Sequence, residues 1–154
     1  MSMRFIADLH IHSKYSRATS KDMNLEEIDR VADEKGILVM GTGDFTHPKW
    51  LEEIKEKLEP AEPGLFKLKS DYKKPTIKGN LSEKRVILSV EISRIYTRAG
   101  KVSRIHNLVF MPSIEAAENL RNKLIILGCN LNSDGRPIIG LDSEKLAEIV
   151  FNVD

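Results

Sequence analysis

The chain has 154 residues, of which 41% are hydrophobic and 31% are charged. This balance is typical of a single globular domain and excludes an intrinsically disordered chain. No apolar run approaches the ~20 residues of a membrane-spanning helix, and the N-terminus has no signal-peptide pattern. The single cysteine, Cys129, excludes an internal disulfide and is typical of a protein of the reducing cytoplasm.

The net charge of +1 conceals an uneven distribution of charge along the chain. The segment from Lys67 to Arg104 holds eleven Lys and Arg residues and three acids, whereas acids outnumber bases elsewhere. We interpret residues 67–104 as a basic insertion that favours a phosphate-rich partner such as DNA, although a solvated surface loop has the same composition. The candidate DNA contacts are Lys73, Lys74, Lys78, Tyr96, Arg98, Lys101 and Arg104.

The first half of the chain alternates expected strands with expected helices. A short strand over residues 3–6 precedes a helix over 24–35, which begins with the Asn-x-x-Glu spacing of a capping box. Gly36 follows where a helix end favours a positive φ angle. The apolar run 37–40 predicts a buried strand, and the proline at residue 48 predicts a second helix over 48–58.

The second half is expected to hold several strands and two more helices. Helix and strand alternate early and an antiparallel insertion follows, so the sequence predicts an α/β fold. Residues 149–154 look like the approach to a further strand, and we therefore expect a longer protein. The strands are expected over 65–68, 86–92, 95–97 and 102–110, with a turn at 98–101, and the helices over 113–127 and 143–150.

The first two of the four histidines lie together. His10 and His12 are two residues apart after the first expected strand, and strand alternation points both imidazoles to the same face. Such a pair is suited to clamp a metal ion, although packed or surface histidines have the same spacing. Asp8 shares their parity and is a candidate to accept an imidazole N–H.

The other candidate residues follow later strands. Asp44 lies in a glycine-rich loop with His47 three residues further on, Glu91 closes an apolar strand, and His106 lies inside another. Each has an ordinary explanation, as a turn, a helix cap or a core histidine. Together they place imidazoles and carboxylates on successive strands, whose ends share one site in many α/β folds. That combination suits zinc, manganese or iron.

The motifs around these residues resemble those of the PHP (polymerase and histidinol phosphatase) superfamily. Residues 8–13 (DLHIHS) resemble its opening motif, the GTGD that ends at Asp44 its second, Glu91 its third and His106 a later one. Longer stretches resemble the endonuclease Q branch. Those stretches are 8–16 (DLHIHSKYS), 41–50 (GTGDFTHPKW), 104–108 (RIHNL) and 132–137 (NSDGRP).

The resemblance implies a distorted β/α barrel and a metal-dependent DNA endonuclease that cuts on the 5′ side of deaminated bases or abasic sites. It implies two or three divalent ions, with zinc expected first and manganese or iron as alternatives. Glu91 and Asp44 are the expected catalytic residues. Phe45 departs from the second motif, which often reads Asp-His, so His47 is a secondary candidate. The expected metal ligands are His10, His12, Asp44, Glu91 and His106.

The superfamily's last histidine and its closing Asp-x-His motif have no counterpart in the sequence. We therefore expect residues 1–154 to be the N-terminal portion of one PHP-type domain, a partial barrel that lacks the C-terminal strands and helices. Turnover by this portion alone is not expected. Two alternatives stay open: a small-molecule phosphatase of the same superfamily, and a non-catalytic nucleic-acid-binding module with a degenerate metal site.

Overall fold

The computed structural model describes residues 4–77 and 83–153, which form a mixed α/β fold. Its centre is a sheet in the order β1-β2-β5-β4-β3, with β6 and β7 also paired to β5. The strands are β1 (Ile6–Asp8), β2 (Ile37–Gly41), β3 (Leu58–Pro60), β4 (Phe66–Leu68), β5 (Arg85–Arg98), β6 (Lys101–Met111) and β7 (Ile138–Ile139). The helices are α1 (Leu25–Lys35), α2 (Pro48–Lys57), α3 (Ile114–Ile126) and α4 (Ser143–Phe151), with a 3₁₀ turn at Ser70–Tyr72.

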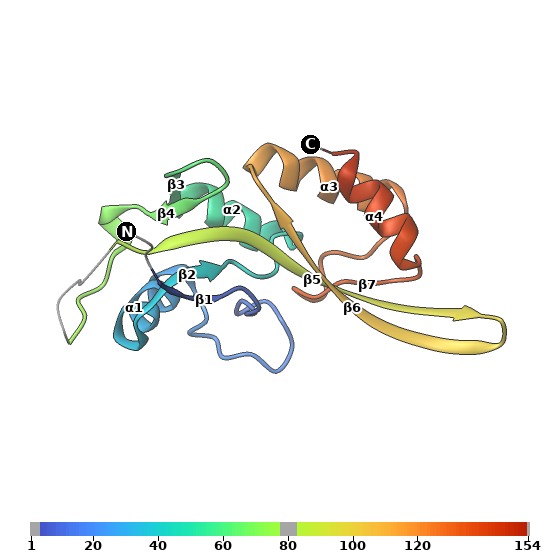
Figure 1. Ribbon diagram of the computed structural model, residues 1–154, viewed down its shortest axis with the longest axis horizontal. Helices are drawn as coiled ribbons and strands as arrows, with labels where there is room; N and C mark the ends of the chain where they lie inside the picture. The colour runs from blue at the N-terminus through green and yellow to red at the C-terminus, as the bar shows by residue number, and fades with distance from the viewer. Residues whose placement is uncertain (1–3, 78–82, 154) are drawn as a thin grey trace.

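The first half of the sheet is parallel. β1 pairs with β2, and β2 pairs with β5, in registers that set Met40 beside both Asp8 and Val86. Because the strands run the same way, the loops that leave β1 and β2 emerge at one edge of the sheet. β5 runs through the length of the molecule, with α1, β1 and β2 beside its first half and α3 and α4 beside its second (Figure 1).

Local signals explain the predicted helices. Asn24 caps α1 by accepting a hydrogen bond from the Glu27 backbone N–H, and Gly36 ends it with φ of 71°. Pro48 opens α2, as expected. The buried faces of α2 and α3 enclose the core with β5, and Trp50 at its centre is fully buried. Within the described residues, no helix is both long and apolar enough to cross a membrane.

The antiparallel insertion is more continuous than the sequence predicted. The two expected strands 86–92 and 95–97 are one strand, β5, which pairs with β6 from Leu88 to the turn at Ala99 and Gly100. Both turn residues have positive φ angles, 50° and 74°. Because β6 provides hydrogen-bond partners for the backbone of β5 along this whole length, β5 continues as one strand. The end of the hairpin projects from the body at the right of Figure 1.

Other expectations about the elements were wrong. The first strand begins at Ile6 rather than at residue 3, which lies outside the described residues. β3 and β7 were not predicted; β7 has only two residues and depends on pairing with Ser93 and Arg94 of β5. Residues 149–151 do not approach a strand but complete α4, where Ile149 and Val150 pack on the core.

Candidate metal centre

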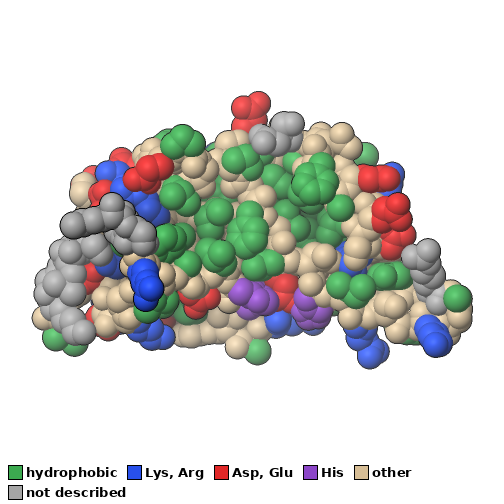
Figure 2. Space-filling view, viewed as in Figure 1, with side chains coloured by type: hydrophobic (Ala, Val, Ile, Leu, Met, Phe, Trp, Pro, Cys, Tyr) green, Lys and Arg blue, Asp and Glu red, His purple; other side chains and the backbone are tan. Residues whose placement is uncertain are grey.

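Glu91 lies at the centre of the candidate site. It projects from β5 and its side chain is 3% exposed. Its Oε2 lies 2.7 Å from Nε2 of His10 and 3.0 Å from Nε2 of His12, while its Oε1 contacts Nδ1 of His106. Three imidazoles from two distant parts of the chain therefore surround one buried carboxylate. Figure 2 shows histidine side chains at the surface on either side of an acidic group, below an apolar area.

The two halves of this group come from different kinds of structure. β1 ends at Asp8, so His10 and His12 lie in the loop that follows it, with ring centroids 5.4 Å apart. Glu91 and His106 lie on the paired strands β5 and β6, several residue pairs away from the turn of the hairpin. The expectation that Glu91 closes its strand was therefore wrong, because β5 continues to Arg98, whereas His106 lies inside β6 as expected.

Two glycines bring the loop after β1 close to the loop after β2. A Cβ atom on Gly43 would lie 2.3 Å from the backbone oxygen of Ile11, and one on Gly41 would lie 2.7 Å from that of Leu9. Gly43 also has a φ angle of 61°. Any side chain at either position would push the histidine loop away from Glu91. The glycines therefore serve the close approach of two backbone segments.

Asp44 is fully buried and contacts the histidine loop. Its Oδ2 accepts hydrogen bonds from the backbone N–H of Ser13 at 2.7 Å and from the hydroxyls of Ser13 and Ser16 at 2.7 and 2.8 Å. Its Oδ1 lies 3.1 Å from Nδ1 of His12. A carboxylate in this position fixes the imidazole orientation and leaves Nε2 facing Glu91. These contacts give Asp44 a positioning role toward His12, and the ligand and catalytic roles expected of it stay predictions.

The charges of the site are set by these contacts. The hydrogen bond to Asp44 raises the pKa of His12, although burial opposes it. Burial alone would raise the pKa of Glu91, but hydrogen bonds with His10 and His106 outweigh burial and hold it below its usual value. Glu91 is therefore ionised at neutral pH, and the site presents a carboxylate ringed by imidazoles.

This donor set fits a divalent metal ion. One ligand atom each from His10, His12 and Glu91 can be chosen so that all three lie within 4.8 Å of one another. Two imidazole nitrogens and one carboxylate oxygen are typical ligands of zinc, manganese and iron. His106 contacts the other oxygen of Glu91, which would allow this carboxylate to be shared between two ions. We refer to His10, His12, Glu91 and His106 as the metal centre.

Two further candidates, Asp8 and His47, and the single cysteine lie outside the metal centre. Asp8 accepts a hydrogen bond from the backbone N–H of His10 at 3.3 Å, rather than from an imidazole as expected. His47 precedes α2 and stacks on Tyr15 with ring centroids 4.5 Å apart, and burial lowers its pKa. Its ring therefore packs against the loop that follows β1 and carries His10 and His12. Cys129 is half-buried, and burial raises the pKa of its thiol, as expected of an unreactive cysteine.

The basic segment divides into two parts with different surroundings. Lys74 pairs with Glu27 of α1 at 2.6 Å, and Lys73 lies 4.0 Å from Glu83. Lys101 and Arg104 are exposed on the hairpin and form no ion pair with any described residue. Tyr96 is half-buried beside the Arg94 guanidinium, 5.7 Å from its ring. Lys78 and the side chain of Arg98 lie outside the described residues.

A small pocket adjoins the metal centre and contains one residue that the sequence reasoning missed. It has a volume of about 180 Å³ and is lined by Glu91, Ser93, His106, Asp134, Arg136 and Ile138. Arg136 lies in the NSDGRP stretch that supported the resemblance, but nothing in its local sequence predicted a position beside Glu91. The available signal was a cation directly before Pro137, because a proline restricts the backbone of the residue that precedes it.

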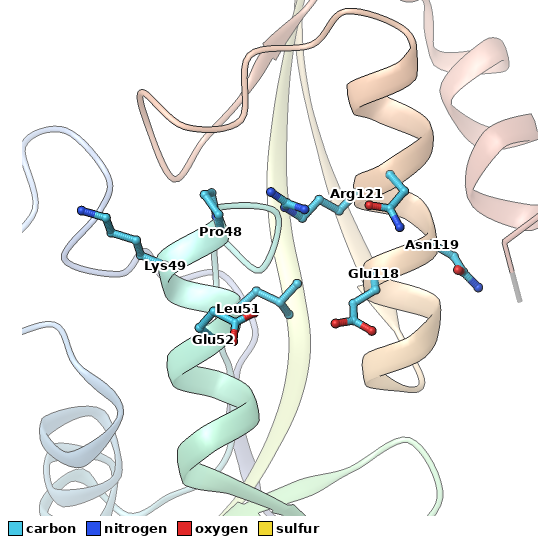
Figure 3. A pocket seen from close by; sticks show the side chains of 8 residues that line it. Pro48, Lys49, Leu51, Glu52, Glu118, Asn119 and Arg121 are labelled. Carbon is cyan, nitrogen blue, oxygen red and sulfur yellow. The ribbon is translucent and has the colours of Figure 1, made fainter.

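A larger cleft of about 450 Å³ lies elsewhere, between α2 and α3 (Figure 3). Its acidic side chains are already paired, since Lys55 lies 3.4 Å from Glu52 and 2.9 Å from Glu118. Arg121 reaches from α3 toward Pro48 at the start of α2 (Figure 3). No residue of the metal centre lines this cleft, so size alone does not identify the functional site.

Comparisons with known proteins agree with the motifs. No protein-family model matches the chain. An uncharacterised protein of Methanocaldococcus jannaschii is 36% identical over 146 residues, which cover 95% of this chain and 15% of that protein.

Two solved structures match over 97% of this chain. One is the lesion-specific endonuclease PfuEndoQ from Pyrococcus furiosus, with a TM-score of 0.76 and 30% identity. The other is endonuclease Q in complex with a 27-mer duplex substrate that has an abasic lesion at the active site, with a TM-score of 0.77 and 31% identity. The chain spans 32% and 33% of the lengths of these two proteins. The resemblance predicted from the motifs is confirmed: along almost all of its own length, the chain is similar in sequence and fold to endonuclease Q of the PHP superfamily.

Proposed function

We propose that the chain carries the metal-binding part of a metal-dependent phosphodiesterase that cuts DNA on the 5′ side of deaminated bases or abasic sites. The observation that carries the proposal is the convergence of His10, His12 and His106 on the buried carboxylate of Glu91. Support also comes from two similar structures, one described as a lesion-specific endonuclease and the other bound to duplex DNA with an abasic lesion.

The residues of the metal centre divide the work of holding ions and orienting ligands. His10, His12 and Glu91 would hold one ion, and Glu91 with His106 a second. When bound, such ions supply Lewis acidity and lower the pKa of water toward neutrality. Asp44 keeps the imidazole of His12 turned toward Glu91 by accepting a hydrogen bond from its Nδ1–H. We expect zinc first, with manganese or iron as alternatives.

The hairpin formed by β5 and β6 is the surface that we propose for contact with DNA. Lys101 and Arg104 are exposed there, without partners among the described residues. Cations of this kind bind backbone phosphates and make affinity depend on salt. We also propose that the sheet forms part of a distorted β/α barrel. The parallel pairing of β1, β2 and β5 supports that architecture, with α1 connecting β1 to β2 and with α2, β3 and β4 between β2 and β5.

The proposal is tested by comparing substrates with the full-length protein. Duplexes with an abasic site, a uracil or no lesion would be incubated with zinc or manganese beside the phosphate monoester p-nitrophenyl phosphate. We expect incision of the two lesion duplexes, and its loss in the Glu91→Gln variant but not in Glu115→Gln, which changes an exposed acid of α3. Hydrolysis of the monoester alone would identify a phosphatase. Metal binding without any hydrolysis would identify a binding module.

A further inference from the structure

We propose that the guanidinium of Arg136 binds an oxygen of the phosphate group that the metal centre receives. This inference rests on the proposed function and adds a residue to the same site. It identifies the ligand of the small pocket as a phosphate anion.

The first argument is position. Arg136 and the metal-centre residues Glu91 and His106 line the same pocket of about 180 Å³. A phosphate group bridging from the ions into this pocket would therefore meet the guanidinium.

The second argument is that the backbone around Arg136 is fixed on both sides. The N–H of Gly135 donates to the backbone oxygen of Tyr15 at 3.1 Å, and a Cβ atom on Gly135 would lie 2.3 Å from Oδ2 of Asp44. On the other side, the backbone N–H of Ser93 donates to the oxygen of Pro137 at 3.0 Å. The loop therefore rests on the same carboxylate that orients His12 and on the strand that carries Glu91. The backbone that carries the Arg136 side chain is therefore preorganised beside the metal centre.

The third argument is charge. The acid closest in the loop, Asp134, accepts a hydrogen bond from the backbone N–H of Arg136 at 3.1 Å and pairs with Arg17 at 3.5 Å. The guanidinium of Arg136 forms no hydrogen bond or ion pair with any described residue, although the residue is half-buried. An arginine fork offers paired donors that match phosphate oxygens, and next to a metal site it would neutralise charge on the phosphoryl group.

The test measures phosphate binding without turnover. The full-length protein would be loaded with Mn²⁺, and inorganic phosphate would be titrated while the ³¹P relaxation rate is followed, because the paramagnetic ion relaxes only phosphate bound close to it. We expect Arg136→Ala to weaken phosphate binding by about tenfold or more, as for the loss of a charged hydrogen bond. Arg136→Lys should recover part of the affinity, since lysine keeps the charge but not the fork.

Two controls make the outcomes distinct. Arg4→Ala removes an exposed arginine beyond the opposite end of β1 and should leave phosphate affinity within about twofold, as expected of a distant screened charge. Mn²⁺ affinity, measured by calorimetry, should be the same in Arg136→Ala and the wild type. Equal phosphate affinity of Arg136→Ala and the wild type would overturn the proposed role of Arg136 and leave the proposed function standing. Loss of Mn²⁺ from Arg136→Ala would have the same consequence. Failure of the Mn²⁺-loaded wild type to bind phosphate would overturn the proposed function as well.

Discussion

The metal centre has an inner side, Glu91 and His12, and an outer side, His10 and His106, which differ in side-chain burial and in hydrogen bonding. On the inner side, Glu91 is 3% exposed and the His12 side chain is 20% exposed and bonded to Asp44. On the outer side, the His10 and His106 side chains are 53% and 55% exposed, and among the described residues only Glu91 is an acid within ion-pair distance of either. The inner side is therefore preorganised, whereas the outer imidazoles are free to adjust when an ion binds. The difference indicates that the inner residues fix where the first ion binds, whereas the outer imidazoles determine how many ions the centre can hold.

The largest effect is expected from the shared inner carboxylate. Glu91→Gln removes the charge that three imidazoles contact, so we expect metal affinity to fall by more than about 100-fold, beyond the loss typical of an outer-shell change. Calorimetric titration with Zn²⁺ and Mn²⁺ would measure this, with Glu115→Gln as the matched control. A loss of less than about tenfold would show that the imidazoles hold the ion without the carboxylate.

A smaller effect is expected from the carboxylate behind His12. Asp44→Asn leaves an amide that cannot accept all the hydrogen bonds from Ser13, Ser16 and His12, so the imidazole loses its fixed orientation. We expect the first ion to bind about 10- to 100-fold more weakly.

The variant His106→Ala should instead leave the affinity for the first ion almost unchanged and reduce the number of ions bound. The reverse pattern in titrations of the two variants would contradict the division into inner and outer sides.

Much of the fold was predictable because its signals are local. Asn24 and Gly36 mark the ends of α1 within a few residues of the hydrogen bonds they control. β7 had no such signal, since a two-residue strand exists only through its pairing with β5. The length of β5 was also a long-range property, because its continuity depends on pairing with β6 as far as Arg98 and Lys101.

The site shows the same limit. The motifs identified His10, His12, Glu91 and His106, and the structure brings them together. The surroundings of Asp44 depend on serines that lie 28 and 31 residues earlier in the chain, which no local pattern indicates. Likewise, composition made Lys74 a candidate DNA contact, and only the fold reveals its pairing with an acid 47 residues away. The residues of the site could be predicted from the sequence, but their hydrogen-bond and ion-pair partners could be identified only from the fold.

The free energy of unfolding should measure how much Glu53 of α2 stabilises the loop that carries His12. Glu53 accepts hydrogen bonds from the hydroxyl of Tyr15 at 2.7 Å and from Lys14, two residues that lie between the serines bonded to Asp44. Burial would raise the pKa of Glu53, but the bonds from Lys14 and Tyr15 outweigh burial and lower it. We expect Glu53→Gln to reduce the free energy of unfolding by about 1.5 kcal/mol at pH 7.

The pH dependence of that loss follows from the direction of the pKa shift. A folded-state pKa below the unfolded value of 4.5 means that the contribution is complete above pH 4.5 and is lost as the pH falls through the folded value. Urea titrations of wild type and variant should therefore converge in acid. A difference that persists unchanged at low pH would show that the carboxylate charge is not the cause.

The smallest effect is expected where the outer side meets the hairpin. Lys101→Ala and Arg104→Ala each remove an exposed cation without a described partner, so each should lower the slope of log affinity against log salt by about one if it contacts a DNA phosphate. Lys74→Ala removes the same charge from a lysine already paired with Glu27, and should leave the slope almost unchanged. Fluorescence anisotropy with a labelled abasic duplex at several salt concentrations would measure both. Equal slopes for all three variants would mean that DNA responds to net charge alone, and that the projecting hairpin is no more a DNA contact than the paired half of the basic segment.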